Sequence, residues 1–243
     1  MKLNRLAANL YCWTIFVVAT LVFGALLPLL TVAQLLLPGR SPGRILRLAI
    51  RRYGWILLRL CYPFIPVTVE NRAGELPLPA IFVANHRSAL DPYLFGVLEV
   101  ENAFITGWPF NIPIYGRVMR TAGYIDARGG WPEVAARGEH LMASGCSLII
   151  WPEGHRSRSG KMGRFRQGAF RLAAATGRPL VPVAIIGAGE VLPPGANMLN
   201  PGPIKLIILP PIALKKEHDG VIVPRLLAAE ARKAITKVLA SAH

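Results

Sequence analysis

A histidine and an aspartate five residues apart are the residues of this sequence best suited to acid–base chemistry. They lie in Asn85-His86-Arg87-Ser88-Ala89-Leu90-Asp91-Pro92, directly after an apolar run, Ala80 to Ala84, that predicts a buried strand. Histidine has the side-chain pKa nearest neutrality, and a carboxylate on its far nitrogen fixes the tautomer. Two interpretations are open at this point: a general base with its orienting carboxylate, or a pair that only caps a turn or a helix.

A second polar loop follows another apolar run, Leu148 to Ile150. It begins Trp151-Pro152-Glu153-Gly154-His155-Arg156-Ser157 and continues to Gly168 through further arginines and a lysine. Arginines are bidentate donors suited to phosphate oxygens, and glycines give the backbone freedom. We expect the single carboxylate, Glu153, to organise these cations through salt bridges. Ligands usually bind at the strand ends of α/β sheets, where both loops lie, although this loop also fits a flexible basic surface.

The charge of the chain implies an anionic partner. The net charge is +15. Apolar residues make up 53% of the 243 residues, a larger share than in an ordinary soluble domain. Glu70 is the first acidic residue, and residues 154–189 form a second zone without acids. Two such zones indicate two anionic contacts, with a membrane face and a phosphorylated substrate as candidates. No zinc-finger or aromatic RNA-binding motif supports nucleic acid as the partner.

The amino-terminal third predicts a membrane-associated helical segment over residues 1–65. Leu10 to Leu37 is uncharged and long enough to cross a hydrocarbon core of about 30 Å, either as one tilted span or as a kinked or re-entrant hairpin at Gly24 and Pro28. The positive-inside bias places the rest of the chain in the cytoplasm. Residues 44–62 predict an amphipathic helix with five arginines on one side, lying at an anionic lipid surface or packed on the domain with a solvated basic face.

Residues 66–243 predict one α/β domain with a mixed, mostly parallel sheet flanked by helices. The expected strands are 67–69, 80–84, 103–106, 123–125, 147–151, 180–186 and 204–209, and the expected helices are 93–100, 114–121, 132–143, 167–176 and 224–240. Neither a Gly-x-Ser-x-Gly elbow nor a phosphate-binding P-loop is present. Cys12, Cys61 and Cys146 are scattered, and no residues have metal-ligand spacing, so we expect no disulfide framework, metal or cofactor.

Four sequence blocks between about residues 80 and 195 resemble the glycerophospholipid acyltransferase family, typified by 1-acyl-glycerol-3-phosphate acyltransferase. Residues 85–91 match its His-x4-Asp motif, and residues 151–157 resemble Phe-Pro-Glu-Gly-Thr-Arg-Ser. Residues 112–128 and 179–185 resemble its second and fourth motifs. The chain departs from the pattern in two places: Thr106-Gly107-Trp108-Pro109 stands where the family often has Lys-x-Glu-Leu, and His155 replaces the threonine.

The resemblance implies roles for particular residues. His86 would be the general base and Asp91 its orienter, while Arg128, Glu153, Gly154 and Arg156 would form the acceptor site, with the arginines on its phosphate. The same blocks contain five further candidates for the site: Asn85, Ser88, His155, Arg158 and Lys161.

The resemblance also implies a reaction and its partners. A fatty acyl group would pass from acyl-CoA or an acyl carrier protein to the free hydroxyl of a lysophospholipid, with 1-acyl-glycerol-3-phosphate, giving phosphatidic acid, as the expected acceptor. The protein would be bound to an anionic membrane, with its catalytic domain on the cytoplasmic side. The alternatives are another lysophospholipid or a lyso-aminolipid as acceptor, or a non-catalytic membrane protein that binds lipid.

Overall fold

A seven-stranded sheet forms the centre of the protein, whose computed structural model describes residues 2–37, 43–157, 160–214 and 222–241. The strands lie in the order β1 (Val67–Asn71), β7 (Ile204–Ile208), β6 (Leu180–Ile186), β2 (Ile81–Ala84), β5 (Ser147–Ile150), β3 (Asn102–Thr106) and β4 (Ile125–Asp126). Strands β6 and β7 are antiparallel, and the other neighbouring pairs of named strands are parallel. The predicted mixed, mostly parallel sheet is therefore confirmed.

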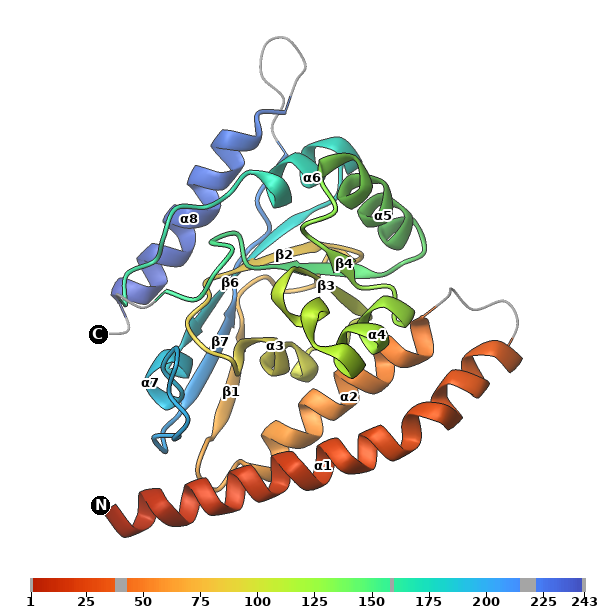
Figure 1. Ribbon diagram of the computed structural model, residues 1–243. Coiled ribbons are helices and arrows are strands. Elements are labelled where there is room, and N and C mark those ends of the chain that lie inside the picture. Colours follow the sequence, from red (N-terminus) through yellow and green to blue (C-terminus); the bar gives the residue numbers. More distant parts are fainter. Residues whose placement is uncertain (1, 38–42, 158–159, 215–221, 242–243) are drawn as a thin grey trace.

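Helices cover both faces of this sheet (Figure 1). One face carries α5 (Trp131–Ala143), α6 (Gly168–Thr176) and α8 (Pro224–Ala240). The other carries α2 (Arg44–Leu60), α3 (Asp91–Leu94) and the 3-10 helix η1 (Phe95–Val97), and α1 (Lys2–Leu36) packs outside α2. The remaining helices are η2 (Trp108–Asn111), α4 (Pro113–Thr121) and α7 (Ala188–Val191). Strands β2 and β5 are buried at every residue because helices cover both of their faces.

Two predicted elements differ from the structure. The expected helix over residues 93–100 begins earlier, at Asp91, and becomes 3-10 from Phe95 to Val97. Here the chain packs closely on α2, since a Cβ atom at Gly96 would lie 2.6 Å from the backbone nitrogen of Trp55. The expected strand over residues 123–125 is reduced to Ile125–Asp126, because Gly123 adopts a φ of 76° and turns the chain.

Helix α1 is continuous through Gly24 and Pro28, so the hairpin interpretation of this segment is wrong. The ring of Pro28 crowds the carbonyl group four residues earlier, which belongs to Gly24. Glycine has the conformational freedom to accommodate this crowding, so the helix can continue. The helix is long and apolar enough, from Asn4 to Leu36, to cross a membrane by length and composition. Its amino-terminal part is tied to the domain, because the Asn9 side chain donates to the Leu199 carbonyl at 2.8 Å and accepts from the Leu199 N–H at 2.7 Å.

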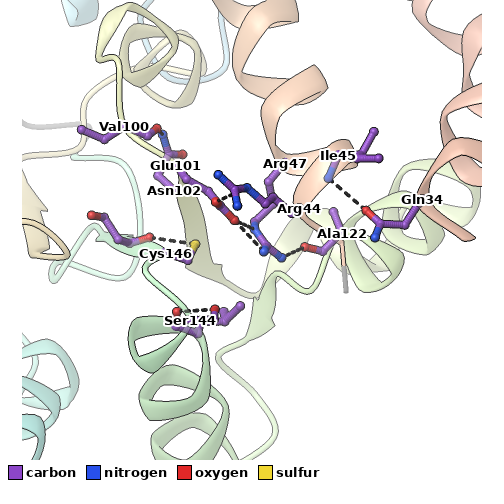
Figure 2. Close-up of polar contacts among 12 residues, drawn as sticks. Gln34, Arg44, Ile45, Arg47, Val100, Glu101, Asn102, Ala122, Ser144 and Cys146 are labelled. Carbon is purple, nitrogen blue, oxygen red and sulfur yellow. Dashed lines mark hydrogen bonds and ion pairs between the residues drawn. The ribbon is translucent and has the colours of Figure 1, made fainter. Parts of the chain in front are cut away.

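Helix α2 is attached to the sheet by a buried arginine (Figure 2). The Arg47 side chain is fully buried; its Nε and Nη2 atoms donate to Glu101 Oε1 at 3.0 and 2.7 Å, and Nη1 donates to the Ala122 carbonyl at 2.7 Å. Arg44 Nε lies 3.0 Å from the other Glu101 oxygen. Arg51 donates to the Leu98 carbonyl. Three of the five arginines thus bind the domain, so neither lipid nor solvent takes up the whole basic side of this helix.

We predict that Arg47→Ala lowers the free energy of unfolding by about 3–5 kcal/mol, because it leaves the Glu101 carboxylate, which is only 10% exposed, without its main partner. Denaturant unfolding of the detergent-solubilised protein measures the change. Arg52→Ala is the matched control, since Arg52 is an exposed arginine of the same helix and we expect little change there. Equal stabilities of the two variants would contradict a structural role for the buried pair.

Candidate active site

Asp91 organises the loop that follows β2. Its side chain is fully buried, and its Oδ2 atom accepts hydrogen bonds from the backbone N–H groups of Arg87 and Ser88 at 2.8 and 2.9 Å. The same oxygen lies 2.7 Å from His86 Nδ1. Because a carboxylate only accepts hydrogen bonds, the pairing assigns the proton to Nδ1 and leaves Nε2 with a free lone pair. The structure thus brings together the histidine and the aspartate of the first motif.

Glu153 joins the loop after β5 to the loop after β2. Its side chain is only 3% exposed; Oε1 accepts the backbone N–H of His86 at 2.8 Å, and Oε2 accepts the N–H of Gly163 at 2.7 Å. The expected salt bridges are absent: in the part of the chain that the structure describes, no arginine pairs with Glu153. Sequence spacing could not show that backbone N–H groups take this role. In the sheet β2 and β5 are parallel neighbours, which is why the two loops meet.

Trp151 is a residue of the site that the motifs did not single out. Its ring centroid lies 5.0 Å from that of His86, at an interplanar angle of 31°, and Phe95 and Phe104 pack on its other sides. This contact fixes the plane of the imidazole ring. The His86 side chain is 19% exposed. The only available sequence signal was the place of Trp151 at the start of the motif over residues 151–157.

The other candidate residues divide into supports and cavity-lining groups. Asn85 is buried and exchanges two hydrogen bonds with the Ile185 backbone, so it holds the end of β2 against β6. The Ser88 hydroxyl is buried and donates to the Leu192 carbonyl. Neither residue borders the cavity described below, whereas Arg128, Glu153, Gly154, His155, Arg156 and Lys161 all do. Arg158 lies outside the described residues.

The two candidate phosphate-binding arginines differ in their surroundings. Arg128 forms a bidentate pair with Asp126, with N···O distances of 2.9 and 2.6 Å, and donates to Asn111 Oδ1 at 2.5 Å. The hydrogen bonds from Arg128 lower the pKa of Asp126. Arg156 has no side-chain hydrogen bond or ion pair with any residue that the structure describes. Its guanidinium therefore keeps all its donors for a ligand.

Arg166 adds a further cation that the motifs did not assign to the site. It lines the cavity, and a Cβ atom on Gly154 would lie only 2.8 Å from its Nε atom. Gly154 also has a φ of 78°, a conformation that other residues rarely adopt. Glycine at this position thus permits both the turn and the close approach of the guanidinium. The dense arginines of this loop were the signal that could have identified Arg166.

A cavity of about 1820 Å³ contains the exposed edge of His86. Pockets for drug-sized ligands measure about 300–1,000 Å³, so this cavity has room for more than one substrate. The loop after β5 supplies a basic wall, while α1, α2 and α4 supply an apolar wall that includes Phe16, Phe23, Leu27, Ile50, Ile114 and Val118. The arrangement suits a molecule with an anionic head and a hydrocarbon tail.

The fold and the paired histidine and aspartate define a class of transferase. Residues 66–186, about half of the chain, match the family model described as Acyltransferase. The chain therefore belongs to the acyltransferase family, as its motifs predicted.

Particular relatives carry the name 1-acyl-sn-glycerol-3-phosphate acyltransferase. The chloroplastic protein of Arabidopsis thaliana is 37% identical over 62% of this chain and 45% of its own length, and that of Brassica napus is 35% identical over 72% and 52%. This chain thus spans about half the length of these relatives. The crystal structure of the 1-acyl-sn-glycerophosphate acyltransferase from Thermotoga maritima superposes with a TM-score of 0.77 and 23% identity, covering 99% of this chain and 96% of that one, and it supports the fold.

We predict that Glu153→Gln both destabilises the protein and impairs the site. One carboxylate oxygen becomes an NH2 group that cannot accept, which leaves a buried backbone N–H unpaired at a cost of about 1–3 kcal/mol. Denaturant unfolding and acyl-transfer rates measure the two effects. Glu190→Gln removes the same charge from a side chain that is 54% exposed, and we expect it to change neither. A Glu153→Gln variant as stable and active as the parent protein would refute the organising role.

Proposed function

We propose that the protein transfers a fatty acyl group from an acyl thioester to the free hydroxyl of 1-acyl-glycerol-3-phosphate, giving phosphatidic acid. The observation that carries the proposal is the hydrogen bond of 2.7 Å between His86 and the buried Asp91 at the edge of a cavity with one basic and one apolar wall. The names of the relatives support this choice of acceptor.

The reaction needs one proton to leave the acceptor hydroxyl. Nε2 of His86 takes this proton as the hydroxyl oxygen attacks the thioester carbonyl, and Asp91 stabilises the resulting imidazolium. The tetrahedral intermediate collapses as the C–S bond breaks, and the proton passes to the departing thiolate. Held together in one cavity, the two substrates react without a covalent acyl-enzyme.

The surroundings of two nucleophilic side chains, Ser88 and Cys146, support direct transfer. The Ser88 hydroxyl is buried and bonded to the Leu192 carbonyl. Cys146 is buried in the core, and burial raises the pKa of its thiol to about 12, which keeps it protonated. Neither group borders the cavity.

The two walls of the cavity give each part of the acceptor a place. Arg156 and Arg166 take the phosphate, and the apolar wall from α1, α2 and α4 takes the hydrocarbon. The donor is acyl-CoA or an acyl carrier protein, and no cofactor takes part. With α1 in the bilayer, the catalytic domain lies on the cytoplasmic side, in agreement with the greater number of basic residues after the apolar segment.

A different lysolipid is the second candidate for the acceptor. Arg128 already pairs with Asp126, so the cavity holds fewer unengaged cations than the sequence motifs suggest. An acceptor panel of lysophosphatidic acid, neutral lysophospholipids and a lyso-aminolipid, tested with one labelled acyl donor, separates the two candidates.

We predict that His86→Ala lowers the transfer rate by about 10²–10⁴-fold, the usual contribution of a general base. Thioester release and labelled-lipid formation measure the loss, while circular dichroism and vesicle sedimentation check that fold and membrane binding remain. His140→Ala, which changes an exposed histidine on α5, serves as the matched control. Substantial transfer activity in His86→Ala would refute the assignment of His86 as the general base.

We also predict that Arg156→Ala raises the KM for lysophosphatidic acid by about tenfold or more, because one unshared charged hydrogen-bond donor to the phosphate is lost. The KM for the acyl donor should stay unchanged. Steady-state kinetics with each substrate varied in turn make the measurement. If only the donor KM rises, the assignment of Arg156 to the acceptor phosphate is wrong.

A further inference from the structure

Two exposed apolar side chains stand out on η2 and α4. Trp108 is 70% exposed and Ile114 is 74% exposed, more than any other large apolar residue that the structure describes outside α1. Ile112 and Tyr115 beside them are 37% and 38% exposed. Clusters of exposed apolar groups mark surfaces that contact a partner or a membrane.

This surface is continuous with the apolar surface of α1. Trp108 and Ile114 border the same cavity as Phe16, Phe23 and Leu27, although the two segments lie about 90 residues apart in the sequence. In Figure 1, α4 lies on the same side of the sheet as α2 and α1. One opening therefore has α1 along one border and η2 with α4 along the other.

The charges on this surface fit an anionic lipid headgroup. No acidic residue occurs between Glu101 and Asp126, and Arg117 and Arg120 are both exposed on α4. The Arg120 guanidinium lies 6.0 Å from the centre of the buried Phe110 ring, a cation–π contact that holds it beside η2. Tryptophan favours the membrane–water interface, and arginine at that depth reaches the lipid phosphates.

We propose that η2 and α4 form a second lipid-contacting element. Trp108 and Ile114 enter the leaflet that α1 occupies, with Arg117 and Arg120 at the headgroups, so that the cavity between the two elements opens into lipid rather than water. The acyl chains of both substrates then reach His86 without crossing an aqueous layer. The inference rests on the proposed lipid substrates, but its tests below need no turnover.

The first test places a polarity-sensitive nitrobenzoxadiazole label at Trp108→Cys and, as a control, at Leu226→Cys on α8, where Leu226 is 49% exposed. The native Cys12, Cys61 and Cys146 are buried, and the unsubstituted protein checks that they do not react. On vesicles of phosphatidylcholine and phosphatidylglycerol, we expect the label at position 108 to emit at shorter wavelength and with higher intensity, and the label at position 226 to stay unchanged. No shift at position 108 in protein that sediments with the vesicles would overturn the proposal.

The second test compares the vesicle affinity of Ile114→Asp with that of Leu226→Asp. We expect Ile114→Asp to bind the same vesicles about tenfold more weakly or worse, the loss expected when one large apolar side chain no longer enters an apolar phase. Leu226→Asp should bind as the parent protein does. Ile114→Trp should bind as the parent protein does, and circular dichroism of Ile114→Asp checks that this variant is folded. Equal affinities of the two aspartate variants would refute lipid contact by α4, whatever the acyl-transfer assay gives.

Discussion

One oxygen atom, Oδ2 of Asp91, fixes the geometry of the site. It accepts hydrogen bonds from two backbone N–H groups and from His86 Nδ1, all within 2.9 Å. A buried carboxylate is tolerated only when it is well bonded, so the loop must keep this shape for Asp91 to stay in the core. The same three bonds turn the chain between β2 and α3 and orient the imidazole. The shape of the loop and the orientation of the His86 ring therefore both depend on this carboxylate oxygen.

The loop after β5 is bonded to the loop after β2 by hydrogen bonds that do not involve its positively charged side chains. Glu153 bonds to two backbone N–H groups, and the N–H of Ser157 donates to the His86 carbonyl at 2.9 Å. Had Glu153 paired with arginines, it would have cancelled charge at the place where a phosphate is expected to bind. Backbone bonding instead closes the loop and leaves Arg156 and Arg166 on the wall of the cavity, available to the phosphate of the proposed acceptor.

The sequence predicted those features that depend on neighbours along the chain. The apolar runs gave the strands, and the two motifs marked the carboxyl ends of β2 and β5, which are adjacent because parallel strands present the same ends to one edge of the sheet. Features that depend on distant partners were not predictable. Periodicity placed Arg47 on a basic helical face, whereas Glu101, 54 residues away, draws it into the core. Pro28 indicated a break in the first helix, but α1 continues through it. No sequence pattern showed that Trp151 packs on His86.

Packing also links the amino-terminal helices to the catalytic pair. Helix α2 crosses α3 and η1 at close range because glycines stand at the contact: a Cβ atom at Gly54 would lie 3.2 Å from the Tyr93 carbonyl oxygen, and one at Gly96 would lie 2.6 Å from the Trp55 nitrogen. Helix α3 begins at Asp91 itself. A shift of α2 relative to the sheet would therefore move the carboxylate that orients His86, and the pair of Arg47 with Glu101 opposes such a shift. Under the proposed function this rigidity would serve the reaction, because the depth of α1 and α2 in lipid would set the height of His86 above the acyl chains.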